Sequence, residues 1–239
     1  AENSIAIGQN ALTKSEKTVV VGNDASVDEN SKESVAVGND AKIAGIGSNA
    51  MGYKTEAKSY SNSIGYEAKS NWHSNALGYQ ADANSYPQAF GYSAKADKDS
   101  SAIGKDSSAT GQSSNAMGPY AKATGDYSTA IGQMSKASGE NSIAMGGYTT
   151  ASKNAIAMGR AAHAATNSVS IGYLANANYN AGSVALGANA LVSMDDGVAL
   201  GSDSVADVDK IGGRGNYRYN VYRPVGGQFD EYIEYYDLG

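Results

Sequence analysis

The five residues Ser142-Ile143-Ala144-Met145-Gly146 are one copy of a phrase that occurs fifteen times along this chain, each time closed by a glycine. The closing glycines are Gly8, Gly22, Gly38, Gly52, Gly65, Gly78, Gly91, Gly104, Gly118, Gly132, Gly146, Gly159, Gly172, Gly187 and Gly201. Most successive copies lie 13 or 14 residues apart. Such a fixed short period predicts a solenoid, in which each unit buries its face only by stacking on its neighbours. The function should therefore be sought on a repeating surface.

The two positions before each glycine carry different kinds of side chain. The residue directly before it is large and apolar: Ile7, Val21, Val37, Met51, Ile64, Leu77, Phe90, Ile103, Met117, Ile131, Met145, Met158, Ile171, Leu186 and Leu200. The residue two before it is small or β-branched, as at Ala6, Val20, Ser63, Ala144 and Ser170. Adjacent positions that differ this consistently point to opposite faces of a β-strand.

A second strand follows each glycine. Small residues return three and five positions after it, as at Ala81 and Ala83 or at Ala121 and Ala123. A coil of 13 to 16 residues then holds two short strands and two turns, which is shorter than the coils of about 18 residues in hexapeptide-repeat acyltransferases. A flat coil leaves interior room only for small groups. We therefore place the alanines inside and the large residues outside.

The large outward residues predict an oligomer interface. At roughly 4.8 Å per coil they would form a stripe on the order of 70 Å long, which a soluble monomer hardly tolerates in water. The position three before the glycine lies on the same face and is often an amide, as at Asn49, Asn62 and Asn75. Such amides would hydrogen-bond between subunits or hold water.

Composition supports one repeat domain with a narrow interior. The chain has 239 residues, with two Phe, one Trp and no Cys, so disulfides and thiolate metal sites are excluded. The net charge of −6 disfavours nucleic acid as a partner. No apolar run is long enough to span a bilayer and no signal peptide is visible, while the chain starts in mid-phrase. We expect a fragment of a longer exported protein.

The repeated phrase resembles the head repeats of trimeric autotransporter adhesins of the Yersinia-adhesin type. The copies that carry the resemblance are Ser4-Ile5-Ala6-Ile7-Gly8, Ser34-Val35-Ala36-Val37-Gly38, Ser142-Ile143-Ala144-Met145-Gly146 and Ser183-Val184-Ala185-Leu186-Gly187. One such phrase would mean little, but fifteen in phase over residues 1–206 are highly specific.

This resemblance implies an all-β fold, a left-handed parallel β-roll that assembles as a homotrimer. It implies a head exposed at the cell surface of a Gram-negative bacterium, secreted by the type V route, with a stalk and an outer-membrane anchor outside the fragment. It also implies a virulence function without cofactors, in which the head attaches to extracellular-matrix proteins, such as collagen, fibronectin or laminin, or to cell-surface receptors and glycans. The sequence does not identify the ligand.

Residues 207–239 depart from the repeat and form a Tyr-rich segment. Alternation in 217–222 and 232–235 predicts a β-hairpin joined through Pro224-Val225-Gly226-Gly227, with a basic strand facing an acidic one. One interpretation is a cap over the open edge of the last coil, or an insertion before a neck. The other is a binding site that uses Arg218, Tyr219 and Tyr222, residue types enriched at interface hot spots.

Aromatic residues at turn positions are the main ligand-binding candidates. Four successive coils carry a tyrosine directly after the glycine, at Tyr53, Tyr66, Tyr79 and Tyr92, and Tyr173 repeats this position. A second column, five residues before the glycine, contains Tyr60, His73 and Tyr86, with Trp72 beside it. Exposed rings would offer stacking surfaces to sugars or apolar groups. The alternative is that these rings stabilise the ladder or cover gaps between subunits.

Enzymatic function is not expected from this sequence. It contains no nucleophile elbow, phosphate loop or paired carboxylates set in a pocket, and an alanine-filled roll has no substrate cavity. His73 and His163 are far apart and lack metal-ligand neighbours. The acidic runs at 195–196 and 203–209 predict solvated turns rather than a calcium site. Two alternatives to an adhesin remain, a rigid spacer and a self-association module that causes aggregation or biofilm.

Overall fold

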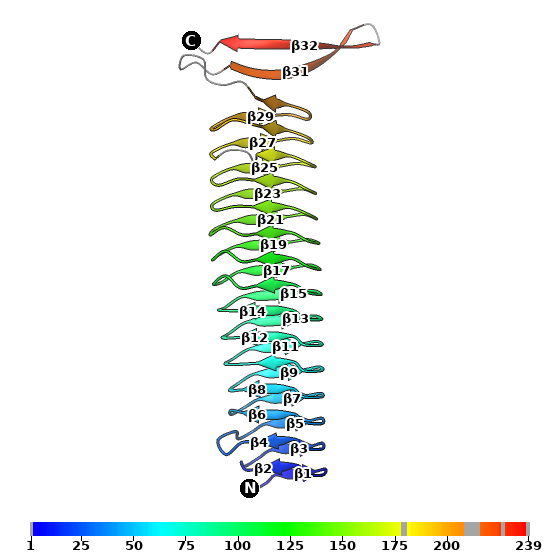
Figure 1. The fold of residues 1–239 in the computed structure, drawn as a ribbon, viewed down its shortest axis with the longest axis vertical. Coiled ribbons are helices and arrows are strands. Elements are labelled where there is room, and N and C mark those ends of the chain that lie inside the picture. The colour runs from blue at the N-terminus through cyan, green and yellow to red at the C-terminus, as the bar shows by residue number, and fades with distance from the viewer. Residues whose placement is uncertain (1, 178–180, 208–215, 226–227, 238–239) are drawn as a thin grey trace. The chain divides into compact units, whose positions relative to one another are not determined.

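A computed structural model describes residues 2–177, 181–207, 216–225 and 228–237. The chain divides into two compact units, Ala1–Tyr127 and Ser128–Gly239. All the regular secondary structure of the described residues is β-strand (Figure 1). Among the described residues, no helix could cross a membrane. Each unit contains a parallel β-solenoid, as the repeat predicts.

Unit 1 contains two parallel sheets, with one strand of each in every coil. Sheet A consists of β1 (Ile5–Ile7), β3 (Val19–Val21), β5 (Val35–Val37), β7 (Asn49–Met51), β9 (Asn62–Ile64), β11 (Asn75–Leu77), β13 (Gln88–Phe90), β15 (Ser101–Ile103) and β17 (Asn115–Met117). Sheet B consists of β2 (Leu12–Thr13), β4 (Ser26–Val27), β6 (Lys42–Ala44), β8 (Glu56–Lys58), β10 (Lys69–Ser70), β12 (Asp82–Asn84), β14 (Lys95–Asp97), β16 (Ser108–Ala109) and β18 (Lys122–Ala123).

Unit 2 repeats this arrangement and adds a hairpin. Its sheet A contains β19 (Thr129–Ile131), β21 (Ile143–Met145), β23 (Ile156–Met158), β25 (Val169–Ile171), β27 (Val184–Leu186) and β29 (Val198–Leu200). Its sheet B contains β20 (Lys136–Ala137), β22 (Thr150–Ala151), β24 (His163–Ala164), β26 (Asn176–Ala177), β28 (Leu191–Val192) and β30 (Val205–Ala206). The hairpin strands are β31 (Asn216–Val225) and β32 (Gln228–Asp237).

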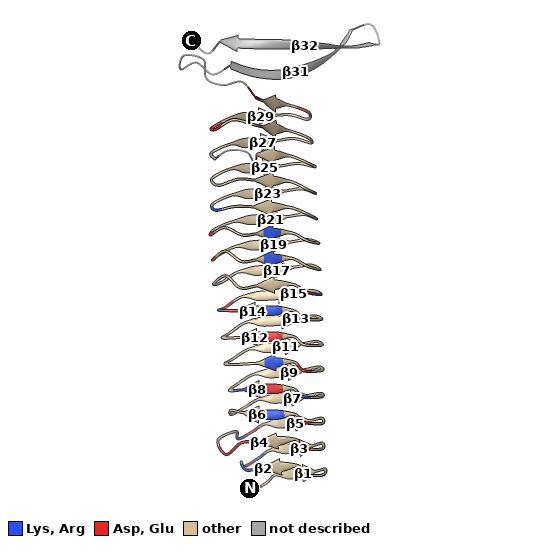
Figure 2. Cartoon of the chain, in the orientation of Figure 1, with Lys and Arg blue, Asp and Glu red and all other residues tan. Residues whose placement is uncertain are grey.

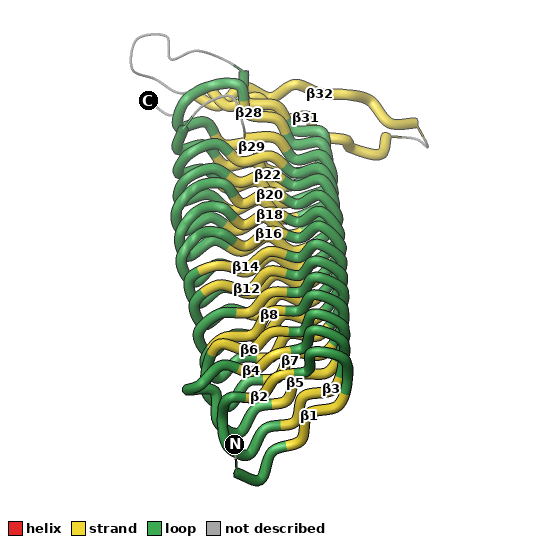
Figure 3. The backbone as a smooth tube through the Cα atoms, turned by 60° about the horizontal axis from the view of Figure 1, so that its bottom comes forward, coloured by secondary structure: helices red, strands yellow, loops and turns green. Residues whose placement is uncertain are grey.

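Equivalent residues of successive coils lie directly beside one another. In sheet A, Ala76 of β11 pairs with Ala89 of β13, and Leu77 pairs with Phe90. The turns are also hydrogen-bonded from coil to coil, since the amide of Gln80 donates to the Tyr66 carbonyl at 2.8 Å. Two columns of turns therefore border the strands in each unit (Figure 3). Any side chain repeated at one position becomes a straight column.

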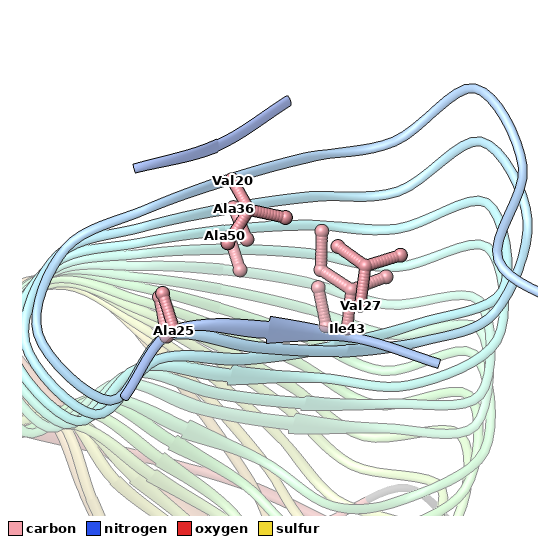
Figure 4. Packing of buried hydrophobic residues seen from close by; sticks show 8 residues of the cluster. Val20, Ala25, Val27, Ala36, Ile43 and Ala50 are labelled. Atoms are coloured by element: carbon pink, nitrogen blue, oxygen red, sulfur yellow. The ribbon is translucent and has the colours of Figure 1, made fainter. Parts of the chain in front are cut away.

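The interior is filled by small side chains, as predicted. Ala76, Ala81 and Ala83 are fully buried, and the same positions of most other coils hold buried alanine. The coils near the N-terminus use larger groups, because Val20 from sheet A meets Val27 and Ile43 from sheet B in the interior (Figure 4). Ala6 in β1 is the exception, since it is exposed.

Buried serines connect the two sheets, a role that the sequence analysis missed. The serine four residues before the closing glycine lies at the corner of the coil. The Ser48 hydroxyl donates to the Lys58 carbonyl at 2.9 Å, and the Ser100 hydroxyl donates to the Ala109 carbonyl at 2.8 Å. Both acceptor carbonyls belong to the last residue of a sheet B strand, β8 and β16 respectively. These bonds therefore provide a donor for carbonyl groups that face the interior.

The amides next to the apolar stripe form a ladder within the chain. Asn49 donates to Asn62, and Asn62 donates to Asn75, each with a nitrogen–oxygen distance of 2.7 Å. The sequence analysis predicted bonds between subunits or to water for these groups. Within the chain these groups bond between successive coils, because in-register stacking brings equivalent amides within bonding distance; bonds to other subunits or to water stay a prediction.

The closing glycines allow the coils to stack closely. Gly78 has φ of +139°, and a Cβ atom on it would lie 2.2 Å from the carbonyl oxygen of Gly91 in the next coil. A side chain at this position is therefore excluded both by conformation and by contact with backbone. The two effects together explain why glycine closes the phrase in coils such as this one, on which another coil stacks.

One interior position offers a stabilising substitution. The Ser63 hydroxyl is buried without a hydrogen-bond partner, at a position where most coils have alanine. We expect Ser63→Ala to raise the free energy of unfolding by about 1 kcal/mol, because it removes an unsatisfied polar group. Thermal unfolding followed by circular dichroism measures this as an increase of about 2–4 °C in Tm.

The matched control is Ser74→Ala. The Ser74 hydroxyl donates to the Ala83 carbonyl at 3.1 Å, so its removal is expected to lower Tm. A lower Tm for Ser63→Ala as well would contradict the assignment of Ser63 as unsatisfied.

The hairpin predicted for the C-terminal segment is present in the backbone. β31 and β32 pair antiparallel, with Arg223 opposite Asp230 and Tyr222 opposite Glu231. One basic position therefore lies opposite an acidic one, while Arg218 lies opposite Tyr235, so the predicted facing of opposite charges holds at Arg223 only. Residues 226–227 of the predicted turn lie outside the described residues, and the function of this segment as a cap or insertion stays a prediction.

Candidate binding surfaces

The four tyrosines that follow the glycines form a continuous stack. The ring centroids of Tyr53 and Tyr66 are 5.0 Å apart, those of Tyr66 and Tyr79 are 4.9 Å apart, and those of Tyr79 and Tyr92 are 4.8 Å apart. The last two pairs are within 5° of parallel. This spacing equals that of neighbouring strands, because each ring is fixed by the backbone hydrogen bonds of its turn.

Two lysines lie over the end rings of this tyrosine column. Lys54 Nζ lies 5.2 Å from the centroid of Tyr53, and Lys105 Nζ lies 5.7 Å from that of Tyr92 and 5.6 Å from that of Tyr120. The side-chain hydrogen bond with Tyr53 raises the pKa of Lys54, and the bond with Tyr120 raises that of Lys105. Both lysines therefore remain cationic at neutral pH.

The stacking restricts what the tyrosine column offers to a ligand. Both faces of Tyr66 and Tyr79 are covered by neighbouring rings, yet these residues remain 41% and 39% exposed. The accessible part is therefore the row of ring edges and hydroxyl groups, rather than the stacking faces that the sequence analysis expected. Desolvation, followed by the nearby Glu67, raises the pKa of Tyr66, so the hydroxyl of this residue is uncharged at neutral pH.

The second aromatic column is a separate surface. The His73 ring stacks between Tyr60 at 4.9 Å and Tyr86 at 5.1 Å, and Trp72 beside it is 58% exposed. These residues belong to the turns that lead from sheet B to sheet A, whereas the tyrosine column lies in the turns from sheet A to sheet B. The predicted patch over residues 53–92 is thus two columns, at the two edges of the flat coil.

The large residues before the glycines face outward in both units. In unit 1, the exposed ones include Met51, Ile64 and Leu77, while Val37 and Phe90 are half-buried. In unit 2, Met158, Ile171 and Leu200 are exposed, and the remaining stripe residues are half-buried. Each unit therefore presents an apolar stripe on the outer face of sheet A.

The three hairpin candidates lie on strand β31. Arg218 pairs in register with Tyr235, and Tyr219 pairs with Glu234. Since β-strand residues alternate between faces, Arg218 and Tyr222 lie on one face of the hairpin and Tyr219 lies on the other. A site that used all three would need both faces.

Charged residues on sheet B were missed in the sequence analysis. Lys42, Glu56, Lys69, Asp82 and Lys95 occupy equivalent positions of successive coils in unit 1. Their signal was available in the sequence as an alternation of sign four residues after five successive closing glycines, Gly38 to Gly91.

The hollows of this surface are open and lined by polar groups. One of about 430 Å³ includes Lys54, Glu56, Lys69 and Asp82, and a second of about 560 Å³ lies beside residues 28–31. Burial in this surface raises the pKa of Asp82, while Lys95 and Lys69 oppose the shift. Across residues 2–177 and 181–207, no three side chains of metal-ligand type gather at a possible metal site.

Comparison with known families identifies the repeat. The family model described as YadA head domain repeat (2 copies) matches residues 1–25, 98–121, 109–133, 123–149 and 165–190. No curated protein matches the chain. Members of this family have an adhesin-like role, and the family implies trimeric association. Together with the solenoid of short parallel strands, these matches support the identification of the repeat region as a YadA-like trimeric autotransporter head domain.

Proposed function

We propose that this chain is the adhesive head of a trimeric autotransporter on the surface of a Gram-negative bacterium. In this proposal it attaches to extracellular-matrix proteins or to cell-surface receptors and glycans by multivalent binding without catalysis. The observation that carries the proposal is the tyrosine column, a rigid row of exposed ring edges and hydroxyl groups on a stacked scaffold. Repetition around a trimer would raise the avidity of a weak site by orders of magnitude.

The apolar stripe of sheet A supports the trimeric part of the proposal. Soluble monomers rarely expose a continuous apolar surface of this kind. Burial of Ile64, Leu77 and their equivalents between three subunits would remove it from water. Sheet B and the turns would remain available to partners, because they lie on other sides of the flat coil.

The proposed binding role is tested by the double variant Tyr66→Ala/Tyr79→Ala. It removes the two inner rings of the tyrosine column, and we expect it to abolish saturable binding to the matrix protein, glycan or cell type that the wild-type chain binds. Binding is measured by biolayer interferometry on panels of matrix proteins and glycans. The melting temperature of the assembly is measured in parallel by circular dichroism.

A matched control is Tyr173→Ala, which occupies the equivalent position in unit 2 but contacts Arg160 rather than another tyrosine ring. The control is expected to bind like the wild type. Unchanged binding by the double variant, together with a lower melting temperature, would contradict the proposal. It would show instead that the rings stabilise the roll.

A further inference from the structure

The outer face of sheet B in unit 1 carries a column of charges whose sign alternates from coil to coil. Lys42, Glu56, Lys69, Asp82 and Lys95 are consecutive partners in the parallel register. Figure 2 shows this alternation along β6, β8, β10, β12 and β14. A pattern of this kind has a repeat of two coils, so it distinguishes one register of a docking partner from the next.

A second column beside it carries charges in two of the same coils. Lys58 in β8 and Asp97 in β14 lie two residues along the strand from Glu56 and Lys95. Because alternate residues of a strand share a face, these side chains point to the same side as the first column. The face therefore carries opposite charges along the strands as well as between them.

Most of these charges have no ion-pair partner within the described residues. The ion pairs within 4.0 Å are Lys17–Glu33, Lys32–Glu16, Lys42–Asp40 and Lys153–Glu140. The six side chains Glu56, Lys58, Lys69, Asp82, Lys95 and Asp97 take part in none of them. They are thus available to a partner that presents the opposite charges with the same spacing.

We propose that this charged face docks, antiparallel and face to face, onto the same face of a second copy of this chain. The two-fold axis would run along the strands, between β10 and β12. Lys69 of each copy would then lie opposite Asp82 of the other, and Glu56 opposite Lys95. In the second column, Lys58 would lie opposite Asp97, which gives three kinds of opposite-charge pair, each occurring twice.

The alternation specifies this register. If the axis passed through β10 instead, Lys69 would lie opposite itself and Glu56 would lie opposite Asp82, so like charges would meet throughout. In the proposed register no like charges meet at the ends of the first column, since Lys42 would lie opposite the uncharged Ser108. The single like-charge opposition joins Asp40 to Asp106, which lie in turns at the border of the face.

A second copy of the chain suits this face better than another charged partner. A polyanion or polycation would meet repulsion at every second coil, whereas an antiparallel copy would place an opposite charge against each of the inner charges. Exposed ion pairs contribute little individually, so the contact gains strength from several pairs and from many heads acting together. Heads that project toward each other from two facing surfaces have this antiparallel orientation.

This inference goes beyond the proposed attachment to other partners. It requires only that sheet B remain exposed, and it uses residues that the tyrosine column does not contain. The alternative is that neighbouring opposite charges stabilise their own sheet, as cross-strand pairs do. In that case charge reversals would change the melting temperature but not the association of two copies.

Aggregation of microbeads that carry the chain tests the proposal. Wild-type beads are expected to clump at low salt, about 0.01 M, and to disperse at about 1 M, where the Debye length falls from about 30 Å to about 3 Å. Lys69→Glu beads and Asp82→Lys beads are each expected to clump at least about tenfold more slowly, a factor in rate that corresponds to about 1.4 kcal/mol of activation free energy. Light scattering measures the clumping rate.

The two variants are then mixed. Glu at position 69 of one variant faces Lys at position 82 of the other, while the unchanged Asp82 faces the unchanged Lys69, so the mixture is expected to clump like the wild type. The double variant Lys69→Glu/Asp82→Lys is expected to regain self-association for the same reason. The control Lys122→Glu makes the same change in net charge as Lys69→Glu, but position 122 would lie opposite the neutral Ser26. This variant should therefore clump like the wild type.

The mixture keeps the test decisive even where a variant is less stable, because mixing cannot restore the folding of a damaged chain. Wild-type beads that stay dispersed at low salt would overturn the proposal. So would Lys69→Glu beads that clump like the wild type, or a mixture and a double variant that both stay dispersed. Failure of the tyrosine variants to lose ligand binding would leave this result unaffected.

Discussion

Gly159→Ala is expected to lower the free energy of unfolding by about 3–5 kcal/mol, the range of the most damaging single substitutions. Gly159 has φ of +121°, and a Cβ atom on it would lie 2.4 Å from the carbonyl oxygen of Gly172 in the next coil. The obstacle is backbone, which cannot rotate aside as a side chain does. The coils would have to separate, and the hydrogen bonds between them would be lost.

Gly201→Ala is the matched control within the same unit. Gly201 has φ of +110°, but a Cβ atom on it would meet nothing within 4 Å. This variant therefore carries the conformational strain of alanine at positive φ, about 1–3 kcal/mol, without the contact between coils. Chemical unfolding with urea measures both values. Equal effects at Gly159 and Gly201 would show that conformation, rather than close stacking, requires the closing glycine.

Met158→Glu/Ile171→Glu is expected to convert the proposed trimer into monomers. The two residues are neighbours in the register of β23 and β25, and they are 36% and 40% exposed in the single chain. In the proposed trimer each copy would bury two new carboxylates against apolar side chains, at a cost of several kcal/mol per ion. Sedimentation velocity measures the change as a loss of the trimeric species.

The control for this variant is Thr150→Glu/His163→Glu, which adds the same two carboxylates on the outer face of sheet B. These positions are also neighbours in register. Since sheet B is expected to lie away from the trimer axis, this control should remain trimeric. Dissociation of the control alone would place the subunit interface on sheet B and would contradict the assignment of the apolar stripe.

The repeat made the fold predictable to the level of individual positions. Alternation of Ala144 and Met145 before Gly146 specified which residue is buried and which faces outward, because a flat two-stranded coil has room only for small interior groups. The same regularity predicted the stacked tyrosine column, since residues at one position of a parallel solenoid lie beside each other. The hairpin was predicted from the alternation around Tyr219 and Tyr222.

Other features depend on geometry that the repeat does not encode. Coverage of the Tyr66 and Tyr79 faces depends on ring orientation, and the separation of Tyr60 from the tyrosine column depends on which turn each occupies. Asn62 was expected to hydrogen-bond between subunits or to water, and in-register stacking also supplies it with partners in the neighbouring coils. The charge alternation at Lys69 and Asp82 is present in the sequence at one position of the repeat, and the strand register places the two residues side by side.

The solution mass of the wild-type chain, measured by sedimentation equilibrium, tests whether the apolar stripe of sheet A is buried between three subunits. If it is, we expect a single species with three times the chain mass of 24.5 kDa, unchanged at about 1 M salt, where electrostatic contacts are screened. A stable monomer at that salt concentration would contradict it, because the stripe would then remain exposed to water.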